Sequence, residues 1–143
     1  MNIITDFKPD DYVINNFKYK ELCCQECLKE EVLYFVHDDI FLARLRLLRS
    51  HLNTPMIPTS GTRCKHHNNI FSKYSKSYHI TGQALDFYTP KQPMIITYQQ
   101  LLYFDFFNGI GVYPQHSTPK MHIDIRKEKY YWVKWNNVNI PLF

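Results

Sequence analysis

The sequence lacks a long uninterrupted apolar stretch, which argues against a membrane-spanning protein. No apolar run approaches the roughly 18–20 residues that a helix needs to cross a bilayer. Residues 1–8 also lack the basic region followed by an apolar core that marks a secretory signal. We therefore expect a chain that is made in the cytoplasm without a signal peptide or transmembrane segment and that does not insert into a membrane.

Runs of like charge are missing too. The formal net charge is +4, but the 17 Lys and Arg are scattered, with no run of five or more. Scattered basic residues are typical of a solvated surface rather than a nucleic-acid-binding segment, so no nucleic-acid partner is expected. Internal repeats and low-complexity segments are absent, and 143 residues with 45% hydrophobic content suit one compact domain. We expect a single domain over residues 1–143, favoured as a monomer, with residues 1–15 as an extended lead-in.

Hydrophobic periodicity predicts an α+β fold. Apolar residues recur every three or four positions from Phe41 to Leu52, which predicts a helix that Asn53 and Pro55 end. A second helix is predicted over residues 97–107, and a short one within residues 64–76, followed by a mobile loop. Strands are predicted after Pro55 and over residues 84–88, 109–114 and 120–126, and the aromatic tail at 130–135 adds an edge strand or a cover. Together they predict a small antiparallel sheet carrying a functional site, with helices packed on one side.

Three side chains form a candidate zinc site. His79 and Asp86 flank Gly82, which lets the backbone turn closely. A catalytic zinc takes three protein ligands, typically His nitrogen and carboxylate oxygen, and keeps a fourth position for water. His122 supplies the third, on a predicted strand whose one face carries His122, Asp124 and Arg126.

Four sequence blocks, in order, resemble the zinc D-alanyl-D-alanine carboxypeptidase family of cell-wall peptidases. They are SGTRCKHHN at 60–68, SYHITGQALD at 77–86, GIGVYP at 109–114 and MHIDIR at 121–126. The resemblance covers roughly residues 15–135 and is greatest to the small single-domain branch, which includes phage and bacterial enzymes and shares the hedgehog/D-Ala-D-Ala peptidase fold. It implies one zinc per chain, held by His79, Asp86 and His122, and hydrolysis of peptidoglycan stem or cross-link peptides at a bond involving a D-amino acid. The alternative is a catalytically inactive, zinc-containing module that binds cell-wall peptides.

The resemblance also implies catalytic roles. Arg63 matches the family's arginine for transition-state or substrate-carboxylate binding, and Ser77 and Tyr113 are expected near the substrate. Many relatives place an acidic residue three positions before the third ligand, but Pro119 stands there. Asp124 is then the expected base, or a partner that orients an imidazole, and His116 is the other candidate base. By the H-x-H register of related enzymes, Lys120 takes the first position and His122 still binds zinc.

The four cysteines leave three readings open. Cys24-x-x-Cys27 and Cys64-x-x-His67 have the spacing of structural zinc ligands. A disulfide is the second reading, and free buried thiols are favoured over both, because Cys23 beside Cys24 gives no clean set of four ligands. His66 and His67 are expected in a loop, and His37 and His51 at the first long helix or its ends. Nucleic-acid binding through a Cys/His zinc site is the least favoured function.

Overall fold

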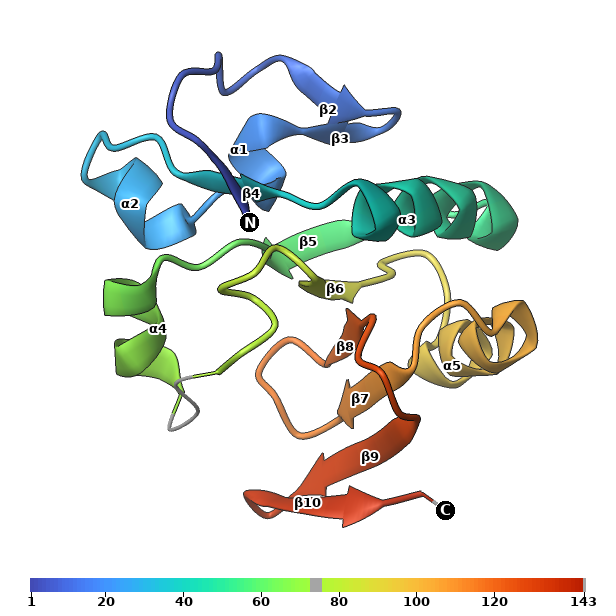
Figure 1. Cartoon of the computed structure of the whole chain (residues 1–143). Coiled ribbons are helices and arrows are strands. Elements are labelled where there is room, and N and C mark those ends of the chain that lie inside the picture. Colours follow the sequence, from blue (N-terminus) through green and yellow to red (C-terminus); the bar gives the residue numbers. More distant parts are fainter. Residues whose placement is uncertain (73–75, 143) are drawn as a thin grey trace.

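A six-stranded sheet dominates the computed structural model, which describes residues 1–72 and 76–142 (Figure 1). Its strands lie in the order β10-β9-β7-β8-β6-β5. Their bounds are β5 (Ile57–Ser60), β6 (Ala84–Tyr88), β7 (Gly109–Tyr113), β8 (Lys120–Asp124), β9 (Tyr130–Trp135) and β10 (Val138–Pro141). Neighbouring strands are antiparallel except β7 and β9, which are parallel. The predicted α+β class is confirmed, and the four strands around the candidate site pair antiparallel.

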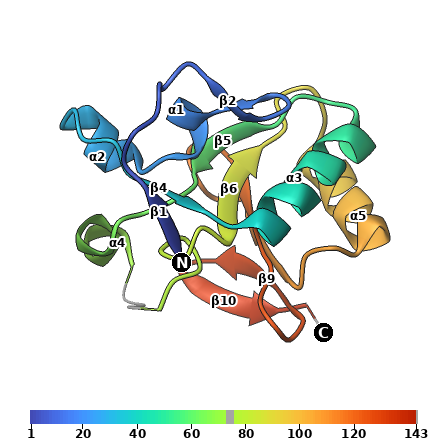
Figure 2. The ribbon, with the colours of Figure 1, turned by 45° about the horizontal axis from the view of Figure 1, so that its top comes forward.

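Two long helices, α3 (Asp39–Leu52) and α5 (Met94–Phe104), lie side by side next to the sheet (Figures 1 and 2). The Asp38 side chain caps α3 by accepting a hydrogen bond from the Phe41 amide, and Asn53 ends the helix in a left-handed conformation. Helix α5 begins three residues earlier than predicted, because Pro93 serves as its N-cap. It ends at Phe104, since Asp105 is left-handed.

The core lies between these helices and one face of the sheet. Leu85 and Phe87 of β6 are fully buried in the same cluster as Leu45 and Leu48 of α3 and Leu101 of α5. Because side chains alternate along a strand, residues 84, 86 and 88 point to the opposite face. The apolar half of the alternation therefore anchors the sheet, and the polar half is left to build a site.

The N-terminal part and the short helices complete the fold. Strand β1 (Asn2–Ile4) pairs with β4 (Phe35–His37), and β2 (Tyr12–Ile14) pairs with β3 (Phe17–Lys18), so the expected lead-in contains two short strands. The short helices are α1 (Tyr19–Leu22), α2 (Gln25–Lys29) and α4 (Lys65–Phe71). Residues 73–75 of the expected loop after α4 lie outside the described part. The aromatic tail, predicted as an edge strand or a cover, forms β9. This strand is interior to the sheet, because β10 pairs with its outer side.

No helix within residues 1–72 and 76–142 combines the length and apolar character needed to cross a bilayer.

Candidate metal centre

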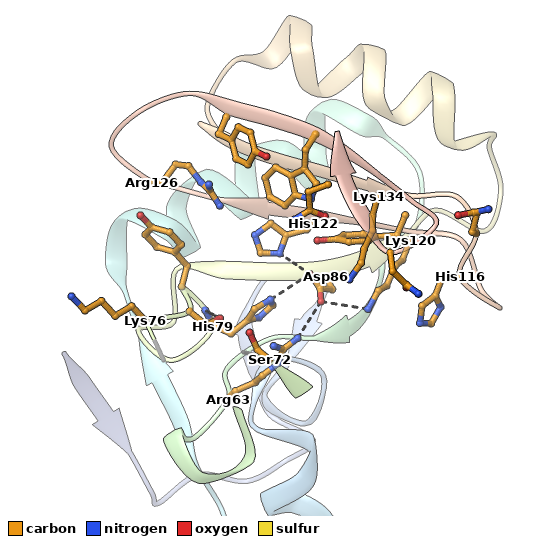
Figure 3. Close-up of a pocket in the computed structure, with 18 residues that line it drawn as sticks. Arg63, Ser72, Lys76, His79, Asp86, His116, Lys120, His122, Arg126 and Lys134 are labelled. Carbon is orange, nitrogen blue, oxygen red and sulfur yellow. Dashed lines mark hydrogen bonds and ion pairs between the residues drawn. The ribbon is translucent and has the colours of Figure 1, made fainter. Parts of the chain in front are cut away.

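The polar face of the sheet brings together the three side chains predicted to bind zinc (Figure 3). Asp86 of β6 and His122 of β8 are cross-strand partners. His79 lies in the turn before β6, where Gly82 has a φ of 70° that suits glycine. Asp86 Oδ1 lies 2.8 Å from His122 Nδ1 and 3.3 Å from His79 Nε2, and all three side chains are buried. Two imidazole nitrogens and one carboxylate oxygen thus converge on one point.

A backbone carbonyl fixes the tautomer of His79. His79 Nδ1 lies 2.7 Å from the Gly61 carbonyl oxygen, which can only accept, so Nδ1 carries the proton. The Nε2 lone pair then faces Asp86. The His79 main chain is also held, because its N–H donates to Ser77 Oγ at 3.3 Å and its carbonyl accepts from the Arg63 N–H at 3.0 Å. The Ser77 side chain therefore braces the loop that carries His79.

A buried carboxylate has the same role for His122. His122 Nε2 donates to Asp124 Oδ2 at 2.7 Å, which leaves Nδ1 directed at Asp86. Asp124 has no exposed surface, and Arg126 donates to it through Nε at 2.8 Å and Nη2 at 2.6 Å. Such carboxylate–histidine pairs orient the ring and raise its basicity toward a metal.

Two glycines of β7 make room for this arrangement. Gly109 is the cross-strand partner of Asp124, and a Cβ there would overlap the Asp124 carboxylate. Gly111 is the partner of His122, and its Cβ would lie 2.5 Å from ring carbons of Trp132. The Trp132 ring in turn lies against His122, with centroids 5.4 Å apart. The spacing Gly-x-Gly in the sequence is thus a packing requirement of the site.

Burial and neighbouring charges set the protonation of the three groups. Burial lowers the pKa of His79, although the Asp86 charge opposes this, so the ring is neutral at neutral pH. Burial would raise the pKa of Asp86, but the hydrogen bond from His122 and the charge of that imidazole hold it well below its usual range. Burial likewise opposes charging of His122, yet hydrogen bonds to Asp124 and Asp86 outweigh it and raise the pKa of His122 to about 9. Without a cation, His122 therefore supplies the positive charge between two carboxylates.

The centre lies in the wall of a cleft of about 940 Å³ (Figure 3). Arg63 Nη2 lies 3.3 Å and Lys120 Nζ 3.6 Å from Asp86 Oδ2. The cleft is strongly basic: among the described residues, five Lys or Arg line it, against one acidic residue, Asp86. The basic lining residues are Arg63, Lys76, Lys120, Arg126 and Lys134. A cleft of this charge attracts anionic ligands.

The remaining predicted residues divide between the cleft and the rest of the molecule. Ser77, Tyr113 and His116 line the cleft, and Figure 3 shows His116 beyond Lys120 as seen from Asp86. His116 is exposed, and its Nδ1 lies 3.0 Å from the Thr118 carbonyl oxygen. Burial raises the pKa of Tyr113, so its phenol is neutral.

The other histidines lie elsewhere. His66 and His67 belong to helix α4 rather than to a loop, which corrects the prediction. His37 ends β4, and His51 lies in the last turn of α3. None of these four is among the described residues that line the cleft.

Sequence reasoning missed the role of the aromatic tail. Tyr130 and Trp132 of β9 line the cleft and stack on each other, with ring centroids 5.1 Å apart. The Arg126 guanidinium lies 5.0 Å from the Trp132 ring centroid and 5.2 Å from that of Tyr78. Alternation along residues 130–135 would have put Tyr130, Trp132 and Lys134 on one face, but nothing in the sequence tells which strand they lie beside.

Comparison with known proteins agrees with the site. A family model described as Peptidase M15 matches residues 15–124, a span that contains Arg63, His79, Asp86, His122 and Asp124. No curated protein sequence matches the chain significantly.

Proposed function

The chain belongs to the peptidase M15 family, a zinc-dependent, D-Ala-D-Ala carboxypeptidase-like family, and on this premise we propose that it hydrolyses peptidoglycan stem or cross-link peptides at a bond involving a D-amino acid. The observation that carries the proposal is the convergence of His79 Nε2, Asp86 Oδ1 and His122 Nδ1. The other nitrogen of each imidazole is already taken, by the Gly61 carbonyl and by Asp124.

These residues fit a zinc ion. Two neutral imidazoles and a carboxylate are a donor set of catalytic zinc sites, and each ring presents its lone pair inward. When bound, zinc polarises a scissile carbonyl and lowers the pKa of a coordinated water toward neutrality. We assign one zinc to His79, Asp86 and His122.

Arg63 is the residue we assign to the developing negative charge. Its Nη2 lies 3.3 Å from Asp86, and its Nε donates to Ser60 Oγ at 2.9 Å, so the guanidinium is aimed at the centre before substrate arrives. A guanidinium stays charged and can grip a carboxylate or an oxyanion through two parallel hydrogen bonds. Lys120 adds a second cation on the same side. This pairing suits a peptide that carries a free carboxylate near the scissile bond.

The proton transfer is assigned to His116 and the orienting role to Asp124. Burial would raise the pKa of Asp124, but Arg126 and His122 hold it below the ordinary value, and a weakly basic, fully buried carboxylate is a poor base. His116 is exposed on the cleft wall, and we assign it the proton transfer to or from the reacting groups. Ser77 and Tyr113 contribute to substrate binding from the same wall.

One observation favours an inactive binding module as the second candidate. Among the described residues that line the cleft, Asp86 is the sole carboxylate, so the acidic base that many relatives place before the third ligand has no counterpart there. A module that keeps zinc and the basic cleft would bind anionic wall peptides without turnover.

Mass spectrometry of soluble products from purified peptidoglycan separates the two candidates. The zinc-loaded protein is expected to release stem-peptide fragments whose masses name the cleaved bond, and Asp86→Asn, of nearly the same volume, is expected to release none. If the parent binds one zinc at this centre and releases no fragment, the peptidase proposal fails and the binding module replaces it. Fragments released equally by Asp86→Asn would refute the assigned centre.

A further inference from the structure

A second cluster of metal-ligating side chains lies outside the cleft. Cys24, Cys27, Cys64 and His67 place one ligand atom each within 4.8 Å of all the others. Cys24 and Cys27 flank the start of α2, and Cys64 and His67 flank the start of α4. Both Figure 1 and Figure 2 show α2 and α4 on the same side of the molecule, away from α3 and α5.

One histidine nitrogen faces all three sulfurs. His67 Nδ1 lies 2.9 Å from Cys64 Sγ, 3.4 Å from Cys27 Sγ and 3.8 Å from Cys24 Sγ. Tetrahedral zinc with Zn–S bonds of about 2.3 Å and a Zn–N bond of about 2.0 Å separates nitrogen from sulfur by about 3.5 Å. The three distances scatter around that value. A disulfide would leave this convergence of three sulfurs on one nitrogen unexplained, and all four cysteines are free.

The surroundings are those of a thiolate site. His67 Nε2 lies 3.4 Å from Glu30 Oε1, so a carboxylate holds the nitrogen that faces away from the sulfurs. The Cys64 amide donates to Cys24 Sγ at 3.5 Å, and the His67 amide donates to Cys64 Sγ at 3.4 Å. Cys24, Cys27 and His67 are buried. Amide donors stabilise thiolates, and several buried thiolates persist together only with a cation among them.

We propose that Cys24, Cys27, Cys64 and His67 form a second, structural zinc site. Four protein ligands close the coordination shell, as in structural rather than catalytic zinc sites. Zinc there would tie residues 24–27 to residues 64–67, two segments about 40 positions apart in the chain. The neighbouring Cys23 has no part in it, because its side chain is fully buried in the hydrophobic core.

Metal content and cobalt spectroscopy test the proposal independently of peptidase activity. Purified protein is expected to contain two zinc ions per chain, Asp86→Asn one, Cys24→Ser/Cys27→Ser at most one, and the control Cys23→Ala two. Cobalt(II) loaded into Asp86→Asn is expected to show thiolate-to-metal charge-transfer absorption in the near ultraviolet. The same absorption is expected to be absent from the double cysteine variant.

A ligand exchange covers the case in which the double cysteine variant does not fold. His67→Cys keeps four ligands, so it is expected to retain its zinc and to strengthen the charge-transfer band of the cobalt form. Asp86→Asn that contains no metal, cobalt that binds without a thiolate band, or an intact mass showing a disulfide among these cysteines would each overturn the second site. A parent that contains one zinc and an Asp86→Asn variant that contains none would overturn the second site while leaving the catalytic centre in place.

Discussion

Replacing Asp124 by Asn separates an orienting role from a catalytic one. Asp124 Oδ1 accepts from the Arg126 amide at 3.0 Å and from Arg126 Nε at 2.8 Å, whereas Oδ2 accepts from His122 Nε2 and Arg126 Nη2. An asparagine has one acceptor oxygen, and we expect it on the Oδ1 side, because the reverse orientation sets the amide N–H₂ against two Arg126 donors that cannot become acceptors, whereas the Oδ2 side has one such donor, Nη2, and an imidazole that can change its tautomer. Its amide N–H₂ then faces His122 Nε2 and donates to it, so the ring proton moves to Nδ1, the nitrogen assigned to zinc.

The change of tautomer at His122 determines how much zinc affinity the variant loses. Loss of a partner that orients a metal-binding histidine typically lowers metal affinity or activity by about 10–100-fold, which corresponds to about 1.4–2.8 kcal/mol. We expect the zinc Kd of the catalytic centre in Asp124→Asn to rise by this factor in competition with a chromophoric chelator. At saturating zinc, hydrolysis of peptidoglycan by the variant is expected to recover to within about tenfold of the parent.

Asp105→Asn is the matched control. Asp105 is an exposed carboxylate that pairs with Lys129 at 2.8 Å, and its left-handed backbone suits asparagine equally well. Zinc affinity and turnover are expected to stay at the parental values. The reasoning is refuted if Asp124→Asn binds zinc as tightly as the parent but loses turnover by about 10²–10⁴-fold at saturating metal, because that is the signature of a missing general base.

Three further changes test the cleft. Gly111→Ala drives a Cβ to 2.5 Å from the Trp132 ring, so denaturant unfolding should show a loss of about 1–3 kcal/mol; parental stability would contradict the tight packing. Arg63→Lys keeps the charge but loses the fork aimed at Asp86, so kcat/KM should fall by about 10²-fold or more with zinc content unchanged; a loss below threefold would remove Arg63 from the transition state. His116→Ala should lower kcat by about 10²-fold without loss of zinc, and undiminished turnover would exclude it as the proton-transfer residue.

The alternation of polar and apolar residues in the sequence predicted the two strands that hold Asp86 and His122. Alternation around Asp86 and His122 predicted strands with one polar and one apolar face, and both strands are present with those faces. The pairing of Asp86 with His122 across β6 and β8 is a long-range contact that local periodicity cannot supply. The same limit applies to β9, which lies parallel to β7 and so brings Trp132 to the site.

Roles that depend on burial were also open in the sequence. Asp124 was predicted either as base or as orienting partner, since a strand face shared with His122 fits both. Its complete burial and its two-pronged bond with Arg126 favour the orienting partner. Neither property is local, because the space for the carboxylate comes from Gly109 on the neighbouring strand.

The adjacent cysteines Cys23 and Cys24 made the set of four metal ligands hard to recognise in the sequence. Cys24-x-x-Cys27 had the spacing of zinc ligands, but the adjacent Cys23 left no clean set of four ligands, which weakened the case for a metal site. In the structure consecutive side chains diverge: Cys23 enters the core, and Cys24 turns toward His67. The start of α4, rather than a loop, then presents His67 and Cys64 to them.

The proposed zinc sites share the short segment at residues 61–64. Its Gly61 carbonyl accepts a hydrogen bond from His79 Nδ1, and its Arg63 amide donates one to the His79 carbonyl. The segment is anchored at one point by the Thr62 amide on the Leu22 carbonyl, and at its end by Cys64 in the cysteine cluster. Four residues fixed at both ends have little freedom left to lose when substrate binds, which lowers the entropic cost of presenting Arg63. A zinc ion at the proposed structural site would therefore help to order residues 61–64, the segment that presents Arg63 to the proposed catalytic centre.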